Sequence, residues 1–239
     1  MRYGKHGLCL LVTAAIGMTA FAATAQAVTP QFLIGGKSVG ALIANLGGVQ
    51  IGGTGGLLVP ALNLRINCTK FSVQEGVINS GTHANGKLLF EECAAFTIAP
   101  EEEIAECQII SSETDSRPHI TSTGLILPAE LENGSPGLLV EKIVSKVLFT
   151  GEECFLPESN VAKGELCVKI DDNDTVEPTI LMNQTIQGEC SERSALEGGS
   201  GKGFKDKMLY GSQETFVDRT ASLFLTGVHK GMTLGVSLF

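Results

Sequence analysis

Two stretches of the sequence place carboxylates beside a thiol. Residues 87–93 read KLLFEEC and residues 146–154 read KVLFTGEEC, so each has a lysine, apolar residues and then two glutamates next to a cysteine. Grouped carboxylates and thiols could ligate a metal or act in catalysis. However, nearby carboxylates raise the pKa of a thiol, whereas a reactive or metal-binding cysteine needs a lowered pKa. We therefore expect no catalytic, cofactor or metal site here, and we interpret both stretches as strand ends tied by disulfides.

Six cysteines beyond the N-terminal segment could form these disulfides: Cys68, Cys93, Cys107, Cys154, Cys167 and Cys190. No CxxC spacing occurs and the histidines of this region are scattered, so zinc is not expected. An even number of cysteines in an exported chain is typical of disulfides. Turn residues between Cys93 and Cys107, and between Cys154 and Cys167, predict that each of these pairs closes a hairpin. Cys68 with Cys190 would be the third pair, although the sequence does not choose among the connectivities.

Three short segments resemble functional motifs but depart from them. EGGSGKG at 197–203 lacks the first glycine and the final hydroxyl of a phosphate-binding loop. NGSPG around Ser135 has Asn133 where a nucleophile elbow has glycine. DDND at 171–174 lacks the central glycine and the last glutamate of an EF-hand loop. We interpret the three as a loop, an ordinary turn and a solvated turn, with a weak calcium site as the alternative for the last.

The elements that carry these residues have a hydrophobic period of two. Residues 62–68 (LNLRINC) and 232–238 (MTLGVSL) alternate apolar with polar or small residues, as half-buried strands do. Residues 138–149 could form an amphipathic helix, but their β-branched residues favour a strand. Further expected strands are KLLF (87–90), IAECQIIS (104–111), HITSTGLIL (119–127), TILMNQTIQ (179–187), KMLYG (207–211) and ASLFLTG (221–227), with turns at NG (85–86), ENGSPG (132–137) and DDND. The fold class expected is all-β, an antiparallel β-sandwich or an irregular barrel with disulfides.

The N-terminus has the three parts of an export signal. A basic start, an apolar stretch and a small-x-small site predict a signal peptide at 1–27, cleaved after Ala27. Residues 28–239 then form a single β-rich domain, in which the glycine-rich apolar segment 28–61 supplies the N-terminal strands. No transmembrane segment is expected after cleavage, because the glycines, proline and amides of 28–61 make a poor spanning helix.

Charge and composition exclude several classes of partner. Removal of Arg2 and Lys5 with the signal leaves 15 of the 17 basic residues against 26 acidic ones, a net charge of −11. Such a surface repels phosphate backbones, so nucleic acid is not an expected partner. The absence of tryptophan and the single tyrosine beyond residue 27 disfavour both a carbohydrate platform and an outer-membrane barrel, which needs aromatic girdles.

Several strings follow one another in an order that resembles a known group. LRINCTKF, GVINSG, GKLLFEEC, AECQI and ITSTGLILPAEL are followed by LFTGEECFLPESNVAKGELCV and then by KMLYGSQETFVDRTASLFLTGVHKGMTLGV. Over residues 62–239 this order is similar to that of bacterial exported β-rich proteins of unknown function. Cys167 and Cys190 are additional to the pattern. The resemblance implies a single exported β-domain and carries over no active site.

The sequence therefore favours a non-enzymatic, exported protein that serves as a structural or binding component in the periplasm, at the cell surface or outside the cell. One alternative is a subunit of a surface fibre or adhesin, since the alternating C-terminal strand could complete a neighbour's sheet in self-assembly. The other is a secreted hydrolase, which would need a clustered nucleophile and base that no motif identifies. The sequence points to no cofactor and names no ligand.

Overall fold

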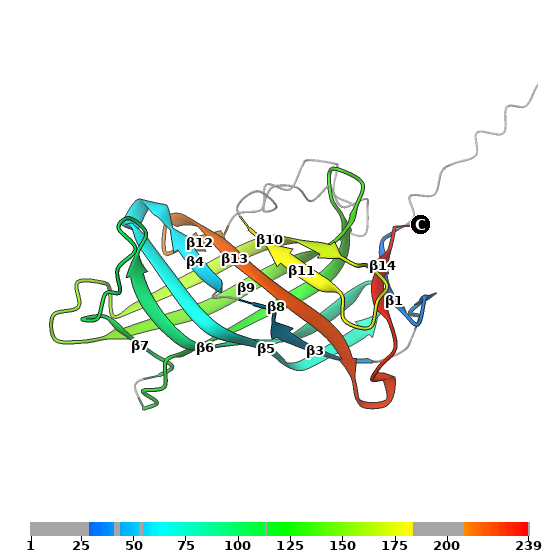
Figure 1. The fold of residues 1–239 in the computed structure, drawn as a ribbon, viewed down its shortest axis with the longest axis horizontal. Coiled ribbons are helices and arrows are strands. Elements are labelled where there is room, and N and C mark those ends of the chain that lie inside the picture. The colour runs from blue at the N-terminus through cyan, green and yellow to red at the C-terminus, as the bar shows by residue number, and fades with distance from the viewer. Residues whose placement is uncertain (1–28, 41–43, 53–54, 113, 184–207, 239) are drawn as a thin grey trace, which may run out of the picture.

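The computed structural model describes residues 29–40, 44–52, 55–112, 114–183 and 208–238 (Figure 1). Within these ranges the chain is almost entirely extended, with two short 3-10 turns, η1 (Pro60–Leu62) and η3 (Gly227–His229). The strands are β1 (Gln31–Ile34), β2 (Lys37–Ser38), β3 (Ala44–Gln50), β4 (Gly55–Val59), β5 (Leu64–Ser80), β6 (His83–Thr97), β7 (Gln108–Ile110), β8 (His119–Glu130), β9 (Pro136–Thr150), β10 (Ser159–Asp171), β11 (Thr179–Met182), β12 (Met208–Tyr210), β13 (Gln213–Thr226) and β14 (Leu234–Ser237). No helix among the described residues is long and apolar enough to cross a membrane.

The long strands close into an antiparallel barrel whose wall has eight strand positions. β5, β6, β8, β9 and β10 pair in that order. β11 and β12 share the next position, because both pair with β10 and with β13. β3 and β4 share the last position and join β13 to β5, which closes the ring. The all-β antiparallel class predicted from the sequence is confirmed, and of its two architectures the barrel is the one observed.

Alternation along each strand turns apolar side chains inward, with local exceptions that keep the core continuous. In β9, Val140 and Ile143 both face the interior although they are three residues apart. Lys142 between them adopts a left-handed conformation, with φ of 54°, and the pairing of β8 with β9 shifts register there. Such a bulge changes which residues face inward, so both apolar side chains stay buried and Lys142 stays in water.

A small three-stranded sheet, β14–β1–β2, packs against one end of the barrel (Figure 1). Phe32 of β1 donates its backbone N–H to the carbonyl of Gly81 in the β5–β6 turn, at 2.7 Å. β1 and β14 also contact β8. Phe32, Val39 and Val236 are buried in the same apolar core as the barrel strands. The small sheet therefore extends the barrel core instead of forming a core of its own.

Most of the expected strands are present, and the differences have local causes. Residues 138–149 form a strand, as their β-branched side chains predicted. The expected turn at Asn85-Gly86 is wrong, because both residues lie inside β6 and the chain reverses at Gly81 and Thr82 instead. In 104–111 only Gln108–Ile110 is a strand. β10 was not expected at all, since its N-terminal half alternates poorly.

The disulfides join different partners from those expected. Cys68 bonds Cys93 on the neighbouring strand, with Cα atoms 4.0 Å apart, and Cys107 bonds Cys154, with Cα atoms 4.7 Å apart. The hairpin pairings Cys93–Cys107 and Cys154–Cys167 are therefore wrong, and so is Cys68–Cys190. Cys68 lies directly opposite Cys93 in the β5–β6 register, so the short cross-strand distance outweighs closeness in sequence.

Cys167 is fully buried and is also disulfide-bonded. Cys190 itself lies outside the described residues, as do the expected signal peptide at 1–27, the segment EGGSGKG at 197–203 and the part of TILMNQTIQ beyond residue 183.

Candidate functional site

The first acidic stretch, KLLFEEC, is a kink in the barrel wall. Glu92 has a left-handed backbone, with φ of 54°, and this conformation lets Phe90 and Cys93, three residues apart, both join the core. Glu92 points outward and accepts hydrogen bonds from the side chains of Lys70 and Thr69 on β5. Those two hydrogen bonds lower the pKa of Glu92. The carboxylate of Glu92 therefore lies on the opposite side of the wall from the sulfur of Cys93.

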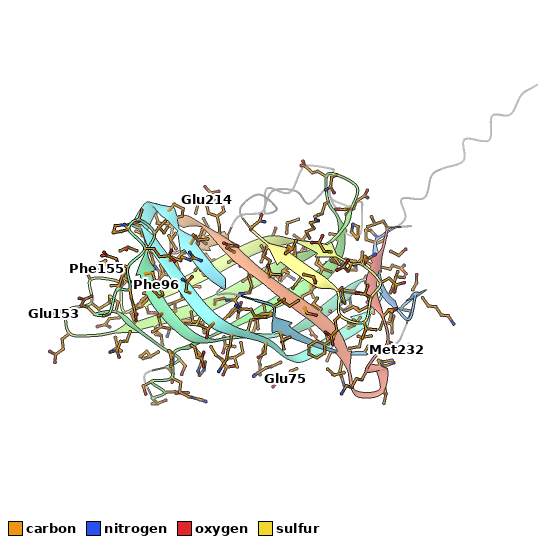
Figure 2. The ribbon with its side chains drawn as sticks, viewed as in Figure 1. Glu75, Phe96, Glu153, Phe155, Glu214 and Met232 are labelled. Atoms are coloured by element: carbon orange, nitrogen blue, oxygen red, sulfur yellow. A yellow bond between two sulfur atoms is a disulfide. The ribbon has the colours of Figure 1, made fainter. Side chains whose placement is uncertain are left out.

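The second acidic stretch, KVLFTGEEC, ends in an exposed turn after β9. Figure 2 shows Glu153 and Phe155 at one tip of the molecule, directed away from the barrel, and Phe155 is 72% exposed. Cys154 is engaged in its disulfide with Cys107. Within the described ranges, His, Cys, Asp and Glu side chains form no group of three or more that could hold a metal ion.

The segment DDND fastens the C-terminal strand to the barrel. The Asn173 side chain donates to the carbonyl of Val236 at 2.9 Å and accepts from its N–H at 2.8 Å. Asp174 accepts a hydrogen bond from the Thr233 hydroxyl at 2.7 Å, and Asp171 forms an ion pair with Lys169. These polar side chains are thus engaged in contacts within the chain. Ser135 likewise lies in an ordinary turn, where its N–H and hydroxyl both donate to Asn133.

The barrel interior contains a cavity of about 110 Å³. Strands from all around the wall contribute to it, and nearly every lining side chain is apolar, among them Ile66, Phe71, Phe90, Leu138, Val147 and Leu166. Apolar protein cavities of about 150 Å³ stay dry and hold benzene or xenon. The interior can therefore accommodate an apolar molecule about the size of a single aromatic ring or a short acyl chain.

Two serines place hydroxyl groups in this apolar wall. Ser122 on β8 lies opposite Ser145 on β9, and the same row continues to Leu88 on β6 and to Ala162 on β10. All four residues line the cavity. The Ser122 hydroxyl is buried and has no hydrogen-bond partner among the described residues. An unsatisfied buried hydroxyl costs about 1–3 kcal/mol, so this group is available to a polar atom inside the barrel.

Arg219 is the charged side chain of the cavity lining. It is 4% exposed and comes from β13. In a wall of eight positions, β13 and β8 have three positions between them in either direction, so Arg219 and Ser122 come from opposite walls. The guanidinium carbon lies 4.9 Å from the ring centroid of Phe90 on β6. The guanidinium therefore lies against an inward-facing side chain of β6, the strand beside β8.

The guanidinium also closes an irregular part of the wall. Its Nη2 donates to the carbonyl of Gly55 at 2.8 Å and its Nη1 donates to the Gln50 side chain, so it ties the end of β3 to the start of β4. Its Nε has no partner among the described residues. The ring centroid of Phe71 lies 5.5 Å from the guanidinium carbon, and 5.3 Å from the ring centroid of Phe90. Stacking on two rings stabilises a buried cation, by about 0.5–2 kcal/mol for each good contact.

This cation is buried without a counter-ion from the part of the chain that the structure describes. None of the ion pairs within the described part of the chain involves Arg219. Burial lowers the pKa of Arg219 to about 10, and the neighbouring Asp218 opposes that shift. Arg219 therefore remains protonated at neutral pH, with its charge poorly solvated. Buried charges in proteins are ordinarily paired, so an unpaired one in a cavity favours an anion as its partner.

Sequence reasoning missed Arg219, Ser122 and Ser145. The expected strand at 221–227 starts two residues after Arg219, whereas β13 begins at Gln213 and includes it. Had that strand been extended, strict alternation would have placed Arg219 on the face of Ala221 and Leu223. An arginine at an inward position of a strand is the signal that could have found this site.

Comparison of the chain with protein families, with curated proteins and with solved structures finds no match.

Proposed function

We propose that this chain is an exported, non-enzymatic binding protein that holds a small apolar molecule inside its barrel. The observation that carries the proposal is the interior cavity of about 110 Å³ with its almost wholly apolar lining. Burial of an apolar molecule there removes its surface from water, a gain of about 25 cal/mol per Å². A cavity built from paired strands is also preformed, so little ordering is needed on binding.

Export is supported by the disulfides. Cys68–Cys93 and Cys107–Cys154 are compatible with an oxidising compartment. The signal-like composition of residues 1–27 points in the same direction. A binding protein outside the cytoplasm would meet apolar molecules that dissolve poorly in water, and a barrel that encloses them suits that task.

The hydrolase alternative has weaker support. Ser80 and His83 do come within hydrogen-bond distance, with 2.9 Å between the hydroxyl and Nδ1. They are three residues apart at the β5–β6 turn, and neither lines the cavity. The His83 ring also contacts the hydroxyl of Thr82, which is not the carboxylate that commonly orients a catalytic base.

The fibre alternative also has weaker support, because both edges of the C-terminal strand are engaged within the chain. β14 pairs with β1 on one side. On its other side, Leu234 donates its N–H to the carbonyl of Thr175 at 2.7 Å. The side chain of Asn173 hydrogen-bonds both the N–H and the carbonyl of Val236. A strand without an open row of backbone groups offers a neighbouring chain little to pair with.

Binding of the neutral probe octan-1-ol tests the proposed function. We expect octan-1-ol to raise the melting temperature of the protein and to give saturable heat in isothermal titration calorimetry. Ala162→Leu adds bulk inside the cavity and should abolish both effects. Ala105→Leu, the same change at an exposed site, should leave them intact. Absence of binding to the unmodified protein, or equal binding by Ala162→Leu, would overturn the proposal.

A further inference from the structure

We propose that the molecule held in the barrel is a small apolar monocarboxylate, whose carboxylate binds the guanidinium of Arg219 and the hydroxyl of Ser122. This inference rests on the proposed function and names its ligand class. It depends on three features of the cavity: a buried cation, a buried hydroxyl and an apolar remainder.

The cation has binding capacity left over. A guanidinium carries five N–H groups, and the described residues accept two hydrogen bonds from Arg219, at Gly55 and at Gln50. Its Nε has no partner within the described ranges. The edge formed by Nε and one Nη can donate two parallel hydrogen bonds to a carboxylate, the geometry in which arginine and carboxylate fit best.

The hydroxyl supplies a further donor from the opposite wall. Ser122 is 2% exposed and its Oγ lacks a partner among the described residues. The guanidinium of Arg219 lies over the ring of Phe90, and Phe90 is on β6, which pairs with the β8 strand of Ser122. An anionic group beside the guanidinium would satisfy two buried polar groups that are otherwise incomplete.

The rest of the cavity limits the remainder of the ligand. Its other lining side chains are apolar apart from Ser145. A second charged group on the ligand would find no partner there and would have to be desolvated. The volume of about 110 Å³ restricts the apolar part to a short or medium acyl chain or one aromatic ring. A single carboxylate on a compact apolar body satisfies all of these conditions.

Arg219 also has a structural role, since it ties β3 to β4. The test therefore needs a readout that a structural role would not change, namely the preference of the protein for a charged over a neutral ligand of equal length. Octanoate and octan-1-ol provide it, because they share the chain length and differ in the head group.

We expect the unmodified protein at pH 7 to bind octanoate about 10-fold or more tightly than octan-1-ol in calorimetry. Arg219→Met should remove that preference by weakening octanoate alone, whereas Arg219→Lys, which keeps the charge, should retain part of it. Ser122→Ala should reduce octanoate affinity by a smaller factor. Arg117→Met removes an exposed arginine on the outside of the barrel and serves as the matched control.

The outcomes separate the two proposals. Equal affinity of the unmodified protein for the two probes would overturn the carboxylate inference and leave the binding function standing. Failure of both probes to bind would overturn the binding function itself. The comparison on the unmodified protein needs no variant, so it decides the matter even if Arg219→Met does not fold. A bound [1-¹³C]octanoate whose carboxyl carbon titrates as it does in water would also count against contact with Arg219.

Discussion

Gly55→Ala should destabilise the barrel through Arg219. A Cβ atom at position 55 would lie 2.8 Å from both Cζ and Nε of Arg219, whereas unstrained contacts between such atoms lie at about 3.5–4.0 Å. The guanidinium would have to retreat from its hydrogen bond to the Gly55 carbonyl, which is 2.8 Å long. Overpacking costs about 1–3 kcal/mol, and a hydrogen bond to a charged donor contributes about 1.5–3 kcal/mol. Because the side chain relaxes in part, we expect a net loss of about 2–4 kcal/mol in the free energy of unfolding.

Urea denaturation followed by circular dichroism measures this loss, and thermal unfolding should show a fall of about 2–4 °C for each kcal/mol. Gly40→Ala is the matched control, because a Cβ atom there meets nothing within 4 Å. If the clash with Arg219 is the cause, Arg219→Met should make the Gly55 substitution much less costly in a double-mutant cycle. Equal effects of Gly55→Ala and Gly40→Ala, or additivity in the cycle, would refute the reasoning.

Three further predictions concern other parts of the barrel. The double substitution Cys107→Ser with Cys154→Ser opens a loop with a sequence separation of 47 and should lower the free energy of unfolding by about 4 kcal/mol in urea denaturation. In the unmodified protein, peptide mapping without reduction should recover Cys68–Cys93 and Cys107–Cys154, and a Cys93–Cys107 peptide would contradict the structure. Burial raises the pKa of Tyr210 to about 12, so the stability that this group contributes is complete below pH 10 and is lost as the pH rises towards 12. Tyr210 is the only tyrosine in a chain that starts at Val28, so phenolate absorbance near pH 10 from the folded protein would contradict its burial. Asn173→Ala removes two hydrogen bonds to Val236, so it should lower the free energy of unfolding by about 1–3 kcal/mol and speed up hydrogen exchange in β14. Unchanged exchange there would show that the strand is held by other contacts.

The two acidic stretches show how far local sequence reasoning could go. The sign of the electrostatic effect on a thiol predicted that the glutamates do not create a reactive cysteine, and both cysteines are indeed in disulfides. What the stretch KLLFEEC does structurally was not predictable. The left-handed backbone at Glu92 follows from the need to bury both Phe90 and Cys93 in a curved wall.

Alternation of apolar and polar residues determined the all-β class, because a period of two buries one face of a strand wherever that strand lies in the fold. β5 was found in this way and β9 through its β-branched residues, whereas β10 was missed because residues 159–165 carry little alternation. Composition alone also indicated disulfides, since an even set of cysteines in a chain expected to be exported has few other uses.

Which residues meet was decided only by the tertiary structure. Closure of the barrel brings β13 beside β3 and β4, which lie far away in the chain: Arg219 meets the Gly55 carbonyl across a separation of 164. Cys68 and Cys93 likewise pair because β5 and β6 are neighbours in a particular register. The alternation of a single strand specifies which side chains share a face but not which strand lies opposite, because pairing depends on contacts with distant segments. The cavity and its buried arginine therefore exist only once the ring of strands has closed.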